Sequence, residues 1–202
     1  MTQRPQLWVF AGPNGAGKTT LTKTRVAGRI PIVNPDEIAR ELPPDTSATA
    51  TLLKAGRLAI EQRRARLDRR ETFAIETTLT GKGETAFMRA ARAAGYKVNL
   101  IYIGLNRAED SLARVGTRTS NGGHSVPTID LHRRFARSMA NLPTAMQIAH
   151  RSYIVDNSGE GYRLLLVRTA RQTRYVRRRL PSWSKASIPT GLRQSPEMGM
   201  EM

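Results

Sequence analysis

Short apolar runs alternate with longer amphipathic stretches along the chain. Residues 98–105 are apolar almost throughout, which is typical of a central strand in a parallel sheet, because such a strand is buried on both faces. Residues 47–70 place apolar side chains at helical spacing among arginines and predict one long amphipathic helix. Applied to the whole chain, these patterns predict strands at residues 7–11, 32–34, 73–76, 98–105, 153–155 and 163–167, and helices at residues 18–27, 47–70, 84–94, 108–118 and 131–149.

This alternation of strands and helices predicts an α/β fold with a mainly parallel central sheet flanked by helices. We expect a single domain over residues 1–180, because a chain of 202 residues is too short for two comfortable domains. After a basic run at residues 171–179 the sequence offers little to bury, so residues 181–202 are expected to form a flexible tail. Ligands of such sheets bind beyond the carboxyl ends of the strands.

The strongest chemical signal lies between the first predicted strand and the helix after it. Residues 12–19 read GPNGAGKT and match the G-x-x-x-x-G-K-[ST] pattern of a phosphate-binding loop (P-loop) without a deviation. Lys18 would reach the β- and γ-phosphates of ATP, the Thr19 hydroxyl would ligate Mg²⁺, and Thr20 would support the α-phosphate. We therefore predict a P-loop NTPase fold whose nucleotide contacts are Gly12, Pro13, Asn14, Gly15, Ala16, Gly17, Lys18, Thr19 and Thr20.

Polar residues follow the next two predicted strands. Asp36 comes just after the second strand, where its carboxylate could accept the proton of an attacking hydroxyl; the alternative is that it caps the helix opening at Glu37. Glu76, Thr77 and Thr78 follow the third strand and suit an acceptor's hydroxyls, or outer-shell magnesium ligation through Glu76. The alternative for this segment is a polar connection between a strand and a helix.

Residues 114–137 have the composition of a kinase lid. Paired glycines at 122 and 123 give a hinged loop, and five arginines flank it on two predicted helices, at positions 114, 118, 133, 134 and 137. The planar guanidinium group suits the charge that spreads over a phosphoryl group in transfer, and a lid excludes water. Most of these arginines are expected to be solvated and two to reach the nucleotide.

Other classes are disfavoured. The chain has no cysteine, which rules out a disulfide framework and a thiolate metal site, and its three histidines lack ligand spacing. We find no guanine-binding N-K-x-D motif, no transporter-ATPase signature and no apolar run of about 20 residues that could cross a bilayer. We expect a cytoplasmic protein. The formal net charge of +17 favours polyanionic partners, although an arginine-rich composition would produce the same balance.

Taken in order, these segments resemble the zeta-toxin family of P-loop kinases, in a branch that carries GGHxVP. The resemblance runs from about residue 8 to residue 158 and rests on GPNGAGKTT, NPDE, ETTLTG, RxxxGGHxVP, RRFARSxxNL and VDNS. It implies ATP-dependent phosphorylation, in characterised members of a hydroxyl on UDP-N-acetylglucosamine. It also implies that Asp36 is the catalytic base, that Glu76 with Thr77 or Thr78 touches the acceptor, and that a neutralising antitoxin would be a separate protein.

The resemblance further selects two lid arginines, Arg118 and Arg134, as catalytic residues beside Asp36 and Lys18. It places Asp156 and Asn157 at the border of the adenine. We thus expect a small-molecule kinase that uses ATP and Mg²⁺. Two alternatives stay open: a kinase acting on a nucleic-acid end, motivated by the charge of +17, and a nucleotide-dependent binding module that acts through a partner.

Overall fold

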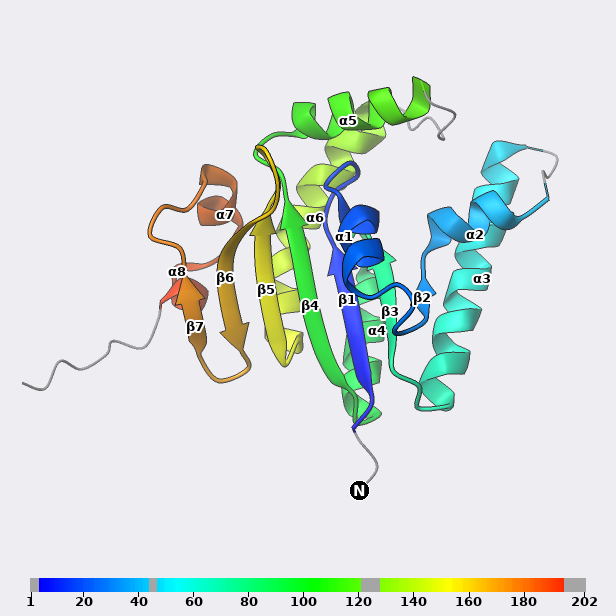
Figure 1. Ribbon diagram of the computed structural model, residues 1–202, viewed down its shortest axis with the longest axis horizontal. Helices are drawn as coiled ribbons and strands as arrows, with labels where there is room; N and C mark the ends of the chain where they lie inside the picture. Colours follow the sequence, from blue (N-terminus) through cyan, green and yellow to red (C-terminus); the bar gives the residue numbers. More distant parts are fainter. Residues whose placement is uncertain (1–3, 44–46, 121–127, 195–202) are drawn as a thin grey trace, which may run out of the picture.

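The computed structural model describes residues 4–43, 47–120 and 128–194 and centres on one seven-stranded sheet (Figure 1). The strands follow one another across the sheet in the order β2-β3-β1-β4-β5-β6-β7. The first five run parallel, and β6 and β7 are antiparallel to their neighbours. Their bounds are β1 Gln6–Ala11, β2 Ile32–Val33, β3 Phe73–Thr77, β4 Lys97–Gly104, β5 Arg151–Asp156, β6 Arg163–Thr169 and β7 Thr173–Val176. The predicted α/β class with a mainly parallel sheet is confirmed.

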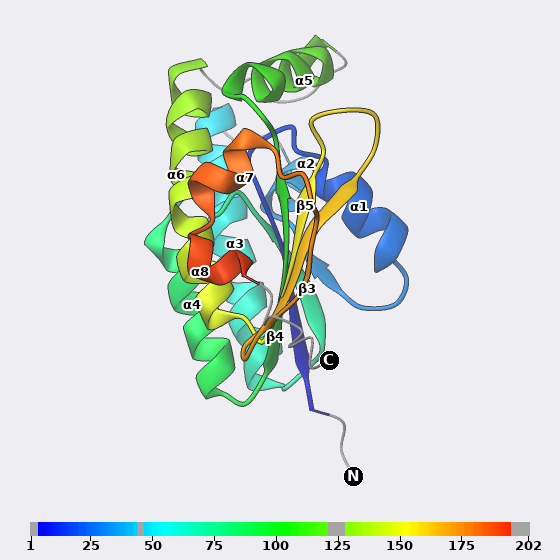
Figure 2. The same ribbon diagram turned by 90° about the vertical axis from the view of Figure 1, so that its left-hand side faces the viewer.

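The helices lie on both faces of the sheet. Figure 2 shows α4, α6, α7 and α8 on one face and α1 on the other, while α2 and α3 pack together beside the β2 edge (Figure 1). Their bounds are α1 Lys18–Arg25, α2 Pro35–Glu41, α3 Ala48–Asp68, α4 Lys82–Ala93, α5 Ala108–Ser120, α6 Thr128–Ile148, α7 Ser182–Ser187 and α8 Thr190–Arg193. None of the helices in the described ranges is long and apolar enough to span a bilayer.

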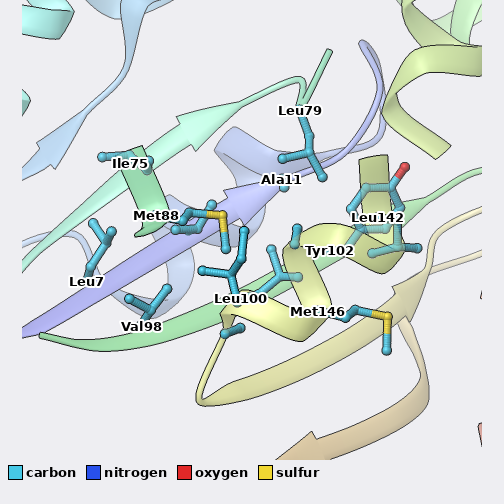
Figure 3. Close-up of a cluster of buried hydrophobic side chains, with 14 of the residues drawn as sticks. Leu7, Ala11, Ile75, Leu79, Met88, Val98, Leu100, Tyr102, Leu142 and Met146 are labelled. Carbon is cyan, nitrogen blue, oxygen red and sulfur yellow. The ribbon is translucent and has the colours of Figure 1, made fainter. Parts of the chain in front are cut away.

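Two apolar clusters hold the sheet between these layers. The larger one joins the strands to α4 and α6, and Leu100, Met88 and Leu142 represent its three contributors in Figure 3. The smaller one lies on the α1 face, where Leu21 packs with Phe10 of β1. Both clusters exclude water from the parallel strands, and burial of this apolar surface is the main force that fixes the strand ends around the P-loop.

The expectation of a flexible tail from residue 181 differs from what the structure shows up to residue 194. Residues 182–193 form α7 and α8, and Trp183 and Ile188 are only 6% and 1% exposed. The indole lies against Gly104, where an added Cβ would meet the ring at 2.3 Å. Two well-placed apolar side chains are too weak a pattern to predict helices. The same holds for β7, which lies inside the basic run of residues 171–179.

Candidate active site

Three polar segments meet at one edge of the sheet because the strands that precede them are neighbours. In the sheet β3 lies between β2 and β1, with Val33 level with Ile75 and Ala11 level with Thr77. Since these strands are parallel, the segments that leave their carboxyl ends emerge side by side. This topology brings together the P-loop after β1, Asp36 after β2 and Glu76 at the end of β3.

Glycine is required at both ends of the P-loop. Gly12 has a φ of 144°, and a Cβ there would meet the Ile103 carbonyl oxygen at 2.1 Å. Gly17 has a φ of 91° and is the N-cap residue of α1. The backbone therefore turns sharply into the helix, whose first amides have no partner within the helix and suit an anion. Asn14 Oδ1 is buried without a hydrogen-bond partner among the described residues.

The P-loop lysine is held by its own loop. Lys18 Nζ donates to the carbonyl oxygens of Gly12 and Pro13, both at 2.9 Å, and the side chain is half-buried. These bonds keep the ammonium group at the mouth of the loop. A phosphate oxygen there would offer the same donors a stronger, charged acceptor.

Thr19 and Glu76 form a pair that fits a magnesium site. The Thr19 hydroxyl donates to Glu76 Oε2 at 2.7 Å, and Glu76 is 4% exposed. Burial raises the pKa of Glu76 above its ordinary value, while the hydrogen bond from Thr19 and the positive charge of Lys18 oppose the rise. Hydroxyl and carboxylate oxygens are the ligands that Mg²⁺ prefers, so the donor set fits this ion.

Asp36 is exposed in the first turn of α2, and its carboxylate has no hydrogen bond or ion pair within the described part of the chain. The helix is capped instead by Asn34, whose Oδ1 accepts from the Asp36 amide at 2.9 Å. The alternative that Asp36 serves as the cap is therefore wrong. The neighbouring Glu37 pairs with Lys23 of α1 at 3.2 Å. Asp36 is thus available to a ligand while the residues around it hold the helix.

The threonine hydroxyls at the end of β3 and after it have two roles: one holds the turn, and another is accessible to solvent. Thr77 is buried, and its hydroxyl accepts from the Leu79 amide at 3.0 Å and donates to Glu84 at 3.2 Å. Leu79 has a positive φ of 57° and no exposed surface, and Asn141 of α6 donates to its carbonyl oxygen at 2.9 Å. Thr77 therefore builds the turn. Thr78, whose hydroxyl lies 3.1 Å from that of Thr80, is the half-buried one nearer to solvent.

Arg63, which no sequence pattern indicated, supports this segment from α3. Its Nη2 donates to the Glu76 carbonyl oxygen at 3.1 Å, and its Nε is buried without a partner among the described residues. Burial lowers the pKa of Arg63, and the charge of Glu84 counters this. In the sequence Arg63 is one of several arginines on an amphipathic helix, so nothing singles it out.

The turn between β5 and β6 holds the P-loop from the other side. Asn157 Nδ2 donates to the Ala16 carbonyl oxygen at 2.9 Å, and Tyr162 Oη donates to that of Gly17 at 2.7 Å. Ser111 of α5 makes a third such bond, to the Asn14 carbonyl oxygen at 2.6 Å. Of these three residues, only Asn157 was selected from the sequence, and it was selected for a place at the adenine and not for a bond to the loop. A backbone oxygen is present at every residue, so the sequence of the loop does not indicate which side chains will donate to it. Tyr162 and Ser111 were therefore not predicted.

Asp156 anchors this turn and is fully buried, so it does not border a nucleotide as the family resemblance implied. Its carboxylate accepts from Ser158 at 2.6 Å, from Trp183 Nε1 at 2.9 Å and from the Arg163 guanidinium. Burial alone would raise its pKa, but these three donors outweigh burial and lower it. Asp156 therefore links β5, β6 and α7 at the start of the turn that carries Asn157.

The structure describes only some of the arginines of the predicted lid. The Arg118 side chain and the GGHSVP segment lie outside the described residues. Arg134 is half-buried on α6, next to Phe135, which packs against both apolar clusters. Arg114, which was not selected from the sequence, lies beside the P-loop: a Cβ on Gly15 would meet the Arg114 Cβ at 3.2 Å.

Comparison with known proteins finds a family whose model matches this chain. A family model described as "Zeta toxin" matches residues 1–163. An uncharacterized protein of Haemophilus influenzae is 34% identical over 130 residues, which cover 61% of this chain and 92% of that protein.

Two solved structures share the fold at low sequence identity. One is the AvrRxo1-ORF1:-ORF2 complex with ATP, at a TM-score of 0.71 and 17% identity, covering 87% of this chain and 61% of that one. The other comes from the PezAT toxin–antitoxin system of Streptococcus pneumoniae, at a TM-score of 0.61 and 18% identity, covering 78% of this chain and 69% of that one. The chain thus spans about three fifths of the AvrRxo1 chain, and the shared part is the fold.

Proposed function

The chain belongs to the zeta toxin family, and from this premise we propose that it is an ATP-dependent kinase that phosphorylates a hydroxyl group of a small molecule. The observation that carries the proposal is that the Asp36 carboxylate, which has no partner among the described residues, follows β2 at the same edge of the sheet as the P-loop and the Thr19–Glu76 pair. A general base must be unengaged and within reach of the acceptor, and a phosphate site must bind the terminal phosphate next to it. The order of β2, β3 and β1 supports the proposal, because the segments that carry Asp36, Glu76 and the P-loop leave the same edge of the sheet.

The nucleotide proposed for the P-loop is ATP, with residues 12–20 and Asn157 as its binding residues. The ATP complex of the structural neighbour AvrRxo1-ORF1:-ORF2 supports this choice. Lys18 would exchange its bonds to Gly12 and Pro13 for phosphate oxygens. Thr19 would hold Mg²⁺ directly and Glu76 would hold it through a bound water; the ion would supply charge neutralisation at the terminal phosphates.

Asp36 is proposed to take the proton of the acceptor hydroxyl, while Glu76, Thr77 and Thr78 form the acceptor side of the site. The accessible hydroxyl of Thr78 would contact the acceptor, and Thr77 would act by shaping the turn. Lys18, Arg118 and Arg134 would stabilise the charge on the transferred group. UDP-N-acetylglucosamine is the first acceptor to test, because it is the acceptor that the family resemblance implies.

A separate protein partner is also proposed. The structural neighbours include the AvrRxo1-ORF1:-ORF2 complex and the PezAT toxin–antitoxin system, which supports neutralisation by an antitoxin. Action on a nucleotide sugar would place the protein in the cytoplasm, where such precursors are made.

The test is turnover of labelled ATP by an Asp36→Asn variant. Loss of the base should lower kcat by about three orders of magnitude, within the range for general-base catalysis, with ATP binding unchanged. Glu41→Gln, which neutralises an exposed carboxylate at the other end of α2, is the matched control and should keep full turnover. Unchanged turnover in Asp36→Asn would remove Asp36 from the mechanism.

The same assay separates the two other functions. With γ-labelled ATP and a metabolite extract, a kinase of small molecules yields a labelled metabolite that mass spectrometry identifies. A kinase acting on nucleic-acid ends would instead label an oligonucleotide with a free 5′-hydroxyl. A nucleotide-dependent binding module would hydrolyse ATP slowly and label neither.

A further inference from the structure

The antiparallel part of the sheet leaves one face uncovered. On the side of α1, no helix of the described chain lies over β5, β6 and β7, whereas α6, α7 and α8 cover their other side (Figures 1 and 2). Ile154, Leu166 and Val176 are in register and point into the larger apolar cluster. Because side chains alternate along a strand, Tyr153, Val167 and Tyr175, each adjacent to one of these three residues, face the uncovered side.

This uncovered surface carries a row of aromatic and aliphatic side chains between arginines. Tyr153, Val167 and Tyr175 are in register across β5, β6 and β7, and Tyr175 is 41% exposed. By the same alternation Arg151 and Arg177 lie on this face, two residues from Tyr153 and Tyr175, and both are exposed. We call these five residues the tyrosine–arginine face.

The charge around this face is of one sign. Residues 164–194 contain no aspartate or glutamate, and β7 and its flanks contribute a run of exposed arginines: Arg171, Arg174, Arg177, Arg178 and Arg179. None of these arginines, nor Arg151, has a carboxylate within ion-pair distance in the part of the chain that the structure describes. Unpaired cations held on a rigid sheet repel one another, and an anionic partner would relieve this cost.

We propose that the tyrosine–arginine face binds single-stranded nucleic acid. Arginines that follow a phosphate backbone, with aromatic rings on which bases stack, are the combination that binds single strands without sequence preference. The two tyrosines are separated by β6, which puts their Cα atoms about 10 Å apart given a spacing of about 4.8 Å between strands. That separation leaves room for a base on each ring with the strand running across the sheet.

A single strand fits this face better than an anionic membrane does. A membrane surface is engaged by an amphipathic helix or by protruding apolar side chains that enter the acyl region. Here the apolar row lies within a sheet, and the arginines stand on both sides of it. A duplex is also a poor fit, because its bases are already stacked and leave the tyrosines without a partner.

The experiment measures binding of a fluorescent single-stranded oligonucleotide of about ten nucleotides by anisotropy, in the absence of ATP. The Kd should rise steeply with salt, and Arg177→Glu should weaken binding and make the salt dependence shallower by about 0.7 for each phosphate that the variant no longer neutralises. Arg89→Glu changes the net charge equally on exposed α4, on the far side of the sheet, and should bind as the parent does.

Stacking has its own test. Tyr175→Ala should weaken binding by about fivefold or more, whereas Tyr175→Phe keeps the ring and should bind normally. An oligonucleotide of the same length without bases should bind the parent protein at least as weakly as the normal strand binds Tyr175→Ala, because it loses the stacking on both tyrosines. Melting temperatures would establish that each variant is folded.

The proposal is overturned if Arg89→Glu weakens binding as much as Arg177→Glu does, or if the strand without bases and polyglutamate bind as well as the normal strand. Preferential binding to vesicles that contain phosphatidylserine, with no binding of the oligonucleotide, would assign the face to a membrane instead. Because neither ATP nor an acceptor is present, these results are independent of whether the protein is a kinase.

Discussion

The two parts of the sheet serve the P-loop in different ways. The parallel strands β2, β3, β1 and β4 deliver the loop, Asp36 and Glu76 to one edge, and each of these segments is readable in the sequence. The C-terminal part, which consists of β5, β6, β7, α7 and α8, carries no motif beyond the VDNS segment at the end of β5. It nevertheless holds the loop in place, through the bonds of Asn157 and Tyr162 to backbone oxygens of Ala16 and Gly17.

The reactive residues and the residues that support them are encoded in the sequence in different ways. Reactive side chains must be of given types at given spacings, which makes a motif. A support that bonds to backbone oxygens can be built from many side chains, so its positions follow from the fold. The family match ends at residue 163, and the buried Trp183 that completes the support lies beyond it.

The largest effect is expected from Trp183→Ala, which would remove the residue that joins α7 to the sheet. Loss of a buried tryptophan costs about 3–5 kcal/mol of stability. It also takes one hydrogen bond from Asp156. Urea unfolding would measure the loss. Trp183→Phe keeps most of the packing and should cost less; equal, small losses in both variants would show that the C-terminal part is dispensable for the fold.

Glu76→Gln tests the role of the parallel part of the sheet. If Glu76 acts on magnesium through water, turnover should fall by about 10- to 100-fold, as for other groups that orient metal ligands. Stability should be unchanged or higher, because the raised pKa shows that burial disfavours the charged form. Initial rates across a magnesium titration and parallel unfolding curves would measure both. A large loss of stability would make Glu76 a structural residue.

The sequence predicted the parallel part well for a physical reason. Continuous apolar runs such as residues 98–105 have few alternatives to a buried strand, and the P-loop pattern predicts both the turn after β1 and the start of α1. The antiparallel end was harder. β7 is a four-residue strand with one arginine and one tyrosine, both exposed, and α7 is stabilised by one indole packed on Gly104. Such elements form because they pack on a strand or a residue elsewhere in the fold, and the local sequence pattern does not indicate that contact.

The same limit applied within the site. Asp36, Lys18, Thr19 and Glu76 were selected because their residue types suit phosphoryl transfer, and the structure brings the segments that carry them to one edge of the sheet. Arg63 was missed because arginine on an amphipathic helix is ordinary. Asp156 was assigned to the nucleotide by resemblance, whereas its three donors and full burial make it part of the scaffold.

The pH dependence of stability tests that scaffold role. The pKa of Asp156 is lowered in the folded protein, so its ionised form stabilises the fold above the unfolded value of about 3.9. This contribution is lost as the pH falls through the lower folded pKa. Unfolding free energies measured from neutral to acidic pH should therefore decline, and Asp156→Asn should make the decline shallower while lowering stability at neutral pH. An unaltered slope would indicate that other carboxylates cause the acid sensitivity.

The smallest effect is expected from Tyr162→Phe, which asks whether the C-terminal part influences the nucleotide at all. The variant removes only the hydroxyl that donates to the Gly17 carbonyl oxygen, and one such hydrogen bond contributes about 0.5–1.5 kcal/mol. If the bond positions the loop, the Kd for ATP should rise by about two- to tenfold with little change in melting temperature, because Tyr162 is partly exposed. Tyr175→Phe, which removes a tyrosine hydroxyl from the same part of the chain with no contact to the loop, should leave the Kd unchanged. Equal Kd values in both variants would mean that the Tyr162 hydroxyl does not position the loop, and the C-terminal part would then hold it through Asn157 alone.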